Sequence, residues 1–329
     1  MPTTSGAEPA GPARTAGPRT AGPALGSPPE PTARELATVR RLVLRSSTSL
    51  WRDLPWRSTR DPWSVLVSEV MLQQTQASRV VEPFTRFVAR FPTVAECAVA
   101  SVGEVVRAWA GLGYNRRALN LHRAAVLVVD RHAGRVPDQL DDLLRLPGVG
   151  PYTARAVLAL AYGRRIGVVD TNVSRVLSRA VVGHKLEPQD AQRLADRLVP
   201  ARNPWLFTQA LFDLGARCCT AHAPRCGSCP LASRCRWAEA EAAEPANSAC
   251  KGTASGDPAR AVRRQPPFAG SDREGRGRLV GVLRSSSIAP DRLAAAAGWP
   301  GDEARARRIA EDLVSEGLAC WRGGELALR

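Results

Sequence analysis

Five of the chain's eight cysteines lie in one short stretch, residues 213–235, which is DLGARCCTAHAPRCGSCPLASRC. Four of them follow the spacing C-x6-C-x2-C-x5-C and are Cys219, Cys226, Cys229 and Cys235. A loop this rich in Pro and Gly has little core of its own, so we interpret the thiols as ligands. Zinc ribbons usually join two C-x2-C pairs from distant segments, whereas four thiolates in one compact loop can surround an iron–sulfur cluster. The pattern indicates a metal centre and leaves zinc and iron both open.

Two carboxyl groups have the setting of an acid and a fixed anion. Glu69 lies inside the apolar helical stretch SEVMLQQTQ, where burial would raise its pKa and let it donate a proton. Asp170 follows two valines and opens the helical stretch VVDTNVSRVLSR, so its carboxylate should accept the first-turn amides. Cleavage of a glycosidic bond through an oxocarbenium-like transition state uses this division of labour. The plainer alternatives are a solvent-facing Glu69 and an ordinary helix cap at Asp170.

A third stretch, LRLPGVGPYTARAVLALAYG at residues 144–163, predicts a tight turn between two helices. Gly148 and Gly150 flank one valine, and a proline starts the helix that follows. Amides exposed at these glycines and aimed along a helix N-terminus would form a seat for a phosphate group. An ordinary helix hairpin is the alternative interpretation.

The elements that would position these residues are helices. Residues 35–237 show helical periodicity with short loops and no strand alternation, which predicts an all-α domain with a cysteine loop at 219–235. Residues 1–34 are mostly Pro, Ala, Gly and Thr and predict a disordered tail. Residues 238–266 lose periodicity and predict a linker, and residues 267–329 predict three helices followed by a two-stranded wing, as in a winged-helix module.

Composition narrows the class of protein. The chain has 329 residues, a formal net charge of +15 and a sequence pI near 10.7, which favours a polyanionic partner such as nucleic acid. It contains no apolar run long enough to span a membrane and no signal-like N-terminus, so we expect a cytoplasmic protein that does not bind membranes. In a reducing compartment, clustered cysteines are more often ligands or catalysts than disulfides.

Taken in this order and at these separations, the four stretches resemble the helix-hairpin-helix DNA glycosylase superfamily, which includes endonuclease III. The resemblance covers residues 37–237 and implies that fold, with a 4Fe–4S cluster on Cys219, Cys226, Cys229 and Cys235. Cys218 is then a bystander. The strings PWR, SEVMLQQTQ, GLGY and LPGVGPYTA are similar to adenine glycosylases of the MutY type. That resemblance implies removal of adenine mispaired with 8-oxoguanine or guanine, as part of base excision repair.

The same resemblance implies roles for the catalytic residues. Glu69 would protonate N7 of adenine, and Asp170 would stabilise the developing oxocarbenium ion or bond to it transiently. Tyr162 and Asn172 match pocket residues that help to position these two carboxyls. Tyr152 occupies the position at which bifunctional relatives carry a Schiff-base lysine, so the enzyme is expected to release the base without cutting the strand.

The implied partner is double-stranded DNA with a mismatched or oxidatively damaged pair, from which the adenine is rotated into a pocket. Gln74 would wedge beside the flipped base, flanked by two neighbours in its loop, and other motif residues complete the DNA contacts. The residues expected to contact DNA are Arg57, Gln73, Gln74, Thr75, Tyr114, Gly148, Gly150 and Tyr152. We expect a monomer associated with the bacterial nucleoid.

Two features depart from that family. Its members commonly end in a Nudix-like β domain, whereas residues 267–329 are too few and have helical periodicity. The residue after GLGY is Asn115, where the family often has a second aromatic residue. Three alternatives stay open: a thymine or uracil mismatch glycosylase of the same fold, a non-catalytic DNA-binding iron–sulfur protein, and a redox regulator with a winged helix.

Overall fold

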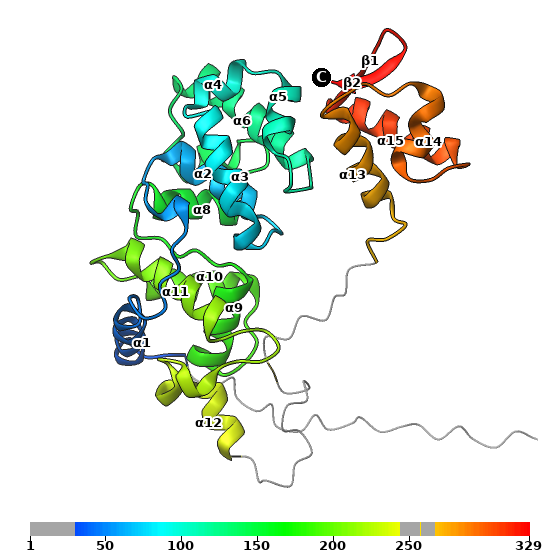
Figure 1. Cartoon of the computed structure of the whole chain (residues 1–329). Coiled ribbons are helices and arrows are strands. Elements are labelled where there is room, and N and C mark those ends of the chain that lie inside the picture. The colour runs from blue at the N-terminus through cyan, green and yellow to red at the C-terminus, as the bar shows by residue number, and fades with distance from the viewer. Residues whose placement is uncertain (1–29, 244–256, 258–266) are drawn as a thin grey trace, which may run out of the picture. The chain divides into compact units, whose positions relative to one another are not determined.

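The computed structural model describes residues 30–243, 257 and 267–329, and almost all of its regular structure is helical (Figure 1). This confirms the predicted all-α class for the part of the chain around the candidate site residues. The described residues include no helix that is both long and apolar enough to cross a membrane.

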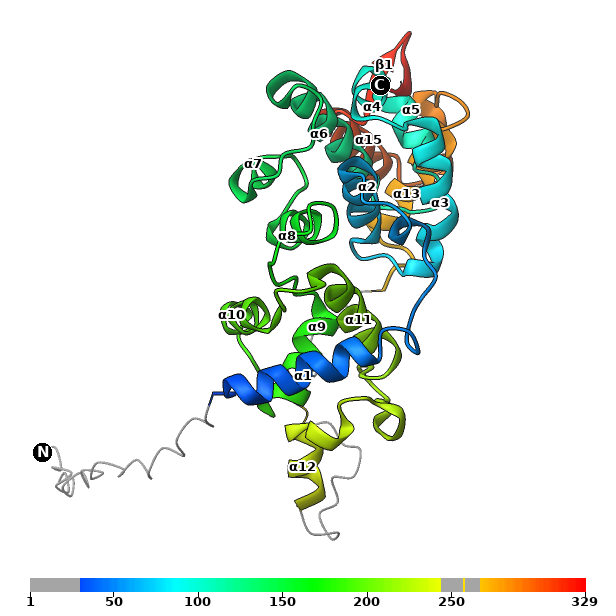
Figure 2. The ribbon, with the colours of Figure 1, turned by 90° about the vertical axis from the view of Figure 1, so that its left-hand side faces the viewer.

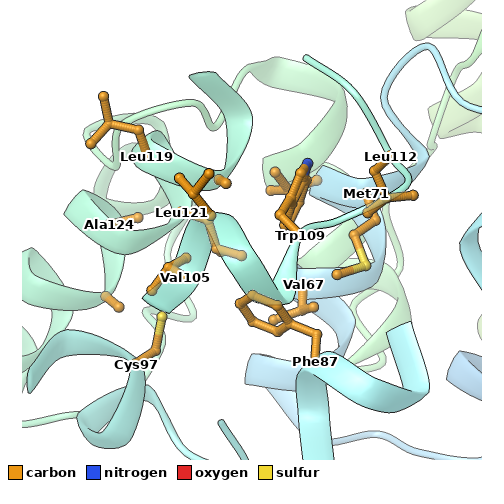
Figure 3. Packing of buried hydrophobic residues seen from close by; sticks show 14 of the residues in the cluster. Val67, Met71, Phe87, Cys97, Val105, Trp109, Leu112, Leu119, Leu121 and Ala124 are labelled. Atoms are coloured by element: carbon orange, nitrogen blue, oxygen red, sulfur yellow. The ribbon is translucent and has the colours of Figure 1, made fainter. Parts of the chain in front are cut away.

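One group of helices packs around a hydrophobic cluster centred on Trp109. The buried indole meets Phe87 edge-on, with ring centroids 5.8 Å apart, and Met71, Leu112 and Leu121 surround it (Figure 3). The helices of this group are α2 (Pro62–Leu72), α3 (Ala77–Arg90), α4 (Val94–Val99), α5 (Val102–Ala108), α6 (Arg116–His132), α7 (Leu140–Leu144) and α8 (Pro151–Leu160). A short 3-10 turn, Pro55–Arg57, precedes α2.

A second group of helices surrounds a separate cluster that includes Val43, Leu177, Phe207 and Leu214. Its first helix, α1 (Ala33–Arg45), lies across α10 (Pro188–Leu198) and α11 (Pro204–Arg217) (Figure 2). The helices are α1 (Ala33–Arg45), α9 (Thr171–Val176) with a π-helical continuation (Leu177–Val182), α10 (Pro188–Leu198), α11 (Pro204–Arg217) and α12 (Arg236–Ala243). The cysteine loop contains two 3-10 turns, Cys226–Ser228 and Ala232–Arg234.

The ends of the predicted segments differ from the elements in the structure. Helix α1 begins at Ala33, where Thr32 and Glu35 form a reciprocal capping box, so the last residues of the predicted tail 1–34 are helical. The predicted linker 238–266 likewise begins with residues that continue α12 up to Ala243. The remainder of both segments, apart from residues 30–32 and 257, lies outside the described residues.

The C-terminal module, residues 267–329, contains three α-helices followed by a hairpin. The elements are α13 (Asp272–Leu283), a 3-10 turn (Pro290–Arg292), α14 (Leu293–Ala297), α15 (Glu303–Glu316), β1 (Ala319–Arg322) and β2 (Glu325–Leu328). The strands are antiparallel, with Ala319 opposite Leu328, and Gly323 and Gly324 make the turn with positive φ angles of 57° and 81°. The residues from Pro31 to Arg329 belong to one compact unit.

Candidate active site

Glu69 lies on α2 with its carboxyl group buried. Asp61 caps that helix by accepting from the amide of Ser64 at 2.8 Å, and Pro62 starts the first turn. The Glu69 residue is 3% exposed, and its Oε2 has no hydrogen-bond partner among the residues that the structure describes. Burial raises the pKa of Glu69 to about 7; the charge of Asp170 adds to this, and a hydrogen bond with Tyr152 opposes it. Near neutral pH this side chain is therefore poised between acid and base.

Asp170 is held by the start of α9. Its Oδ1 accepts from the backbone amide of Val173 at 2.6 Å, and its Oδ2 accepts from the side-chain amide of Asn172 at 2.9 Å. Both donors are oriented toward a carboxylate, and the helix start adds its positive dipole end. The structure therefore places an oriented carboxyl group within electrostatic reach of Glu69, with Asn172 beside it.

Arg175 connects this anion to the cysteine loop, and sequence reasoning missed it. Its Nη2 donates to Oδ1 of Asn172 at 2.6 Å and to the carbonyl of Gly215 at 2.9 Å, while its Nε donates to the carbonyl of Cys219 at 2.6 Å. A Cβ atom at Gly215 would approach Cβ of Asn172 to 2.8 Å, so the close packing of α9 on α11 requires glycine. A hydrogen-bonded path therefore runs from Asp170 to Cys219. The available signal was an arginine one helical turn after the capping aspartate.

The tyrosine beside the two carboxyls is Tyr152. Burial raises its pKa well above the usual value, and the charges of Glu69 and Asp170 add to that effect. Tyr162 was predicted to help position these carboxyls, and this is not what the structure records. Its hydroxyl donates to the backbone carbonyl of Val136, and the acidic groups that perturb its pKa are Asp138 and Asp61.

The loop after α2 presents Gln74 to solvent. This residue is exposed and has a φ of 55°, a left-handed conformation that non-glycine residues rarely adopt. The side chain of its neighbour Gln73 contacts the hairpin and α8 instead. Its Nε2 donates to the carbonyl of Gly148 and to Oγ1 of Thr153, both at 3.2 Å. The wedge loop, residues 73–75, is thereby attached to the hairpin.

Arg117, on α6, ties the wedge loop to the GLGY loop, residues 111–114, and sequence reasoning missed it too. Its guanidinium donates to the carbonyl of Gln73 at 2.5 Å and to the hydroxyl of Thr75 at 3.1 Å. It also donates to the carbonyl of Leu112 at 3.3 Å, and its carbon lies 5.5 Å from the ring centroid of Tyr114. Tyr114 is 48% exposed with a φ of 46°. Two strained, exposed residues, Gln74 and Tyr114, therefore lie in loops that one half-buried arginine holds together.

The predicted hairpin joins α7 to α8. Gly148 has a φ of 79°, and a Cβ atom there would approach Cβ of Asn120 to 2.8 Å, so both conformation and space require glycine. Gly150 is the N-cap of α8, and both glycines are exposed while Val149 between them is buried. This is the geometry expected for a backbone that approaches a ligand closely.

Arg57 was predicted to contact DNA, and the structure places it elsewhere. Its side chain is 3% exposed and donates two hydrogen bonds to Asp213. Nη1 donates to Oδ2 at 2.8 Å, and Nη2 donates to Oδ1 at 2.7 Å. Because both terminal nitrogens of the guanidinium bind this carboxylate, Arg57 links the segment before α2 to α11. The basic residue of the PWR string is a structural anchor in this chain.

The four spaced cysteines line one pocket together with Cys218. Within the described residues, no group of three or more His, Cys, Asp or Glu side chains is positioned to hold a metal ion. The donor set nevertheless fits a four-thiolate centre, because all four sulfur-bearing residues border the same space. Arg179 faces them, with Nη1 donating to the Sγ of Cys219 at 3.6 Å and to the carbonyl of Thr220 at 2.7 Å. A cation in this place suits an anionic cluster of thiolates.

Known proteins are similar to this chain in sequence and in fold. The model of the HhH-GPD superfamily base excision DNA repair proteins matches residues 67–201. The adenine DNA glycosylase of Mycolicibacterium smegmatis is 44% identical over 271 residues, which is 81% of this chain and 87% of that protein. The human adenine DNA glycosylase is 43% identical over 199 residues, 56% of this chain and 36% of the human protein.

Solved structures agree on the fold. A thermostable thymine-DNA glycosylase has a TM-score of 0.60 and 31% identity, with 63% of this chain and 98% of that chain covered. A DNA-bound endonuclease III has a TM-score of 0.57 at 23% identity, with 64% and 99% covered. The chain therefore belongs to the HhH-GPD superfamily of base excision DNA repair proteins and, within it, to the adenine DNA glycosylases of the MutY type.

Proposed function

We propose that this protein removes adenine that is mispaired with 8-oxoguanine or guanine in double-stranded DNA, and that it leaves the sugar–phosphate strand intact. The observation that carries the proposal is the buried carboxyl of Glu69, whose pKa is raised to about 7 beside Asp170 and Tyr152. A group with this pKa serves well as a general acid at neutral pH. The names of the relatives supply the substrate base, adenine.

Protonation of the leaving base is the first step. Glu69 transfers its proton to N7 of a flipped adenine, the bond between N9 and C1′ breaks, and the bonding electron pair departs with the base. The carboxyl oxygen without a partner, Oε2, is the atom free to take part in this transfer. Its burial keeps water away from the acid and maintains the proton on it.

Stabilisation of the sugar cation is the task of Asp170. The oxocarbenium ion that forms at C1′ carries positive charge, which a nearby carboxylate stabilises. Asn172 and the amide of Val173 orient that carboxylate, and Arg175 orients Asn172. A water molecule then adds to C1′ and gives a proton to the Glu69 carboxylate, which restores the acid and leaves an abasic site.

An intact strand follows from the chemistry of position 152. Strand cutting of the lyase type needs an amine that forms a Schiff base with the opened sugar. Tyr152 has no amine, and its raised pKa keeps the hydroxyl neutral, so it can donate a hydrogen bond and cannot form an imine.

The duplex would be bound at the hairpin, and two exposed loop residues, Gln74 and Tyr114, would insert between its bases. Gly148 and Gly150 offer their amides to a phosphate. Gln74 and Tyr114 project from loops that Arg117 ties together, which suits insertion into a base stack from which the adenine has left. Arg57 of the PWR string is paired with Asp213 and takes no part in these DNA contacts.

A 4Fe–4S cluster is the cofactor we assign to Cys219, Cys226, Cys229 and Cys235. Bound there, it would supply a compact negatively charged core that fixes the loop after α11 next to α9. Arg175 and Arg179 would hold the neighbouring carbonyl groups and the Sγ of Cys219. We further propose that the protein acts as a monomer on the bacterial nucleoid in the cytoplasm.

The proposal is tested by single-turnover base release on four duplexes. They carry adenine opposite 8-oxoguanine, adenine opposite guanine, thymine opposite guanine and uracil opposite guanine, each analysed with and without hot alkali. Adenine release that becomes a strand break after alkali supports the proposal. Breaks without alkali would overturn the intact-strand part of it.

The second candidate function is a thymine or uracil mismatch glycosylase. It is favoured by the 31% identity to a thymine-DNA glycosylase over 63% of this chain. Release of thymine or uracil in the absence of adenine release would assign the protein to that class.

A further inference from the structure

Arg284, at the end of α13, reaches from the C-terminal module into the domain that contains the candidate active site. Its Nη2 donates to Oδ1 of Asn115 at 2.8 Å, and its Nε donates to the carbonyl of Val106 at 3.3 Å. Arg107 returns a hydrogen bond to the Arg284 carbonyl at 3.0 Å. One side chain thus bridges two elements of the other domain, α5 and the start of α6.

Asn115 is a buried residue with its side chain committed to this bridge. It is 6% exposed and precedes the first residue of α6, yet its side chain makes no capping hydrogen bond to that helix. The side-chain oxygen faces Arg284 instead. Since a free N-cap asparagine would normally bond the helix amides, the direction of this side chain is set by the C-terminal module.

Asn115 directly follows Tyr114, the exposed residue of the GLGY loop. The loop is already anchored from inside, because Nε1 of Trp109 donates to the carbonyl of Gly113 at 3.2 Å and Arg117 donates to that of Leu112 at 3.3 Å. Arg284 adds a hydrogen bond from the C-terminal module to the side chain of Asn115, one residue after the tyrosine. With φ near 46°, Tyr114 is in a strained conformation that persists only where its neighbours hold it.

The docking of the module is broad enough to keep Arg284 in place. The amide of Gly103 donates to the carbonyl of Arg329 at 2.6 Å, and Arg123 donates to the carbonyl of Glu316 at 2.7 Å. A Cβ atom at Gly103 would lie 3.1 Å from the Arg329 oxygen, so a larger residue there would push its neighbours by a few tenths of an ångström. The buried residues of the module and of helices α2–α8 form one hydrophobic cluster.

We propose that the C-terminal module positions the GLGY loop through the contact between Arg284 and Asn115, and so sets how Tyr114 meets a mispair. Arg284 is a positioning residue, since it acts on DNA through Asn115 and Tyr114. The inference rests on the proposed function, because it assumes that Tyr114 enters the duplex at a mispaired adenine. It gives residues 267–329 a role in recognition of the pair.

The test compares affinities of the full chain for two duplexes. One carries 2′-fluoro-2′-deoxyadenosine opposite 8-oxoguanine, in which fluorine suppresses cleavage, and the other is a fully paired duplex of the same sequence. The dissociation constant for the paired duplex, divided by that for the mispaired duplex, measures discrimination. Arg284→Ala and Asn115→Ala should each lower that ratio about tenfold, as expected for loss of a charge-assisted hydrogen bond. The double variant should lower it no further, because both changes break the same contact.

The matched control is Arg307→Ala, which removes an exposed arginine from α15 of the same module and should keep the wild-type ratio. A purely structural role would lower the active fraction or both affinities together, and leave the ratio unchanged. An unchanged ratio in folded Asn115→Ala and Arg284→Ala proteins would overturn the inference. Wild-type protein that releases no adenine would instead overturn the proposed function, which separates the two failures.

Discussion

The hydroxyl of Tyr152 lies against the buried carboxyl of Glu69, and each group shifts the acidity of the other. Burial raises the pKa of Glu69 to about 7, and the hydrogen bond with Tyr152 keeps it from rising further. Burial raises the pKa of Tyr152 as well, with a contribution from the charge of Glu69. An acid that titrates near neutrality and a tyrosine that stays neutral therefore share the centre of the candidate active site.

Replacing Glu69 by Gln should nearly abolish base release. The amide has no proton to give, and a positioned general acid contributes about 10²- to 10⁴-fold to a rate. Single-turnover release from an adenine·8-oxoguanine duplex measures the loss. Glu82→Gln, on the exposed side of α3, is the matched control and should keep the wild-type rate. A Glu69→Gln protein within tenfold of wild type would mean that another group donates the proton.

Base release should decline as pH rises above about 7. The active form holds the proton on Glu69, whose pKa is about 7, so the protonated fraction falls roughly tenfold per pH unit on the alkaline side. Rates measured at subsaturating protein between about pH 6 and pH 9 report this ionisation. A rate that climbs toward pH 9 would contradict the assignment of Glu69 as the acid.

Glu69 should also make the protein less stable at high pH. Its folded-state pKa lies above the ordinary value of 4.5, so the folded state holds the proton more tightly than the unfolded state. Stability from this group is fully present below about pH 4.5 and is lost as pH rises to about 7, by roughly 3 kcal/mol. Between about pH 5 and pH 8, Glu69→Gln should therefore gain stability relative to wild type. Parallel pH dependences of unfolding in urea would refute this.

Arg175→Gln should slow base release by about tenfold or more, although the residue is not expected to touch DNA. Gln can reach fewer of the three acceptors, on Asn172, Gly215 and Cys219, and loses the charge. Single-turnover rates at saturating protein isolate the chemical step from binding. Arg193→Gln, which breaks an exposed pair with Asp190, is the control and should match wild type. Equal rates in both variants would show that Asp170 needs no support from Arg175.

Loss of a cluster ligand should remove iron from the protein, whereas loss of Cys218 should not. Cys226→Ala deletes one of four proposed ligands, and Cys218→Ala deletes the neighbouring thiol in the same pocket. Iron, zinc and acid-labile sulfide in the purified proteins are the measurements. Zinc in wild type, or equal iron loss in both variants, would contradict the assigned ligands.

The sequence by itself determined the features that depend on near neighbours. An aspartate before a helix start accepts that helix's amides, so Asp170 could be placed as a cap from the residues around it. The apolar helical run around Glu69 left burial and solvent exposure both open, and the structure buries the side chain. Glycines at 148 and 150 predicted a turn, and four cysteines within one loop predicted a metal centre, for which the structure supplies one pocket that all four line. Each of these patterns spans a few helical turns or one loop.

Only the tertiary structure decided which distant residues meet. Tyr152 lies in the first turn of α8 and Tyr162 lies two residues after its end, so most of the helix length of roughly 15 Å separates them. The packing of α2 on α8 selects Tyr152 as the partner of Glu69. Burial of Arg57 against Asp213, and the bridge from Arg284 to Asn115, join segments far apart in the chain. Such pairs depend on how amphipathic helices dock, and local periodicity carries no information about their partners.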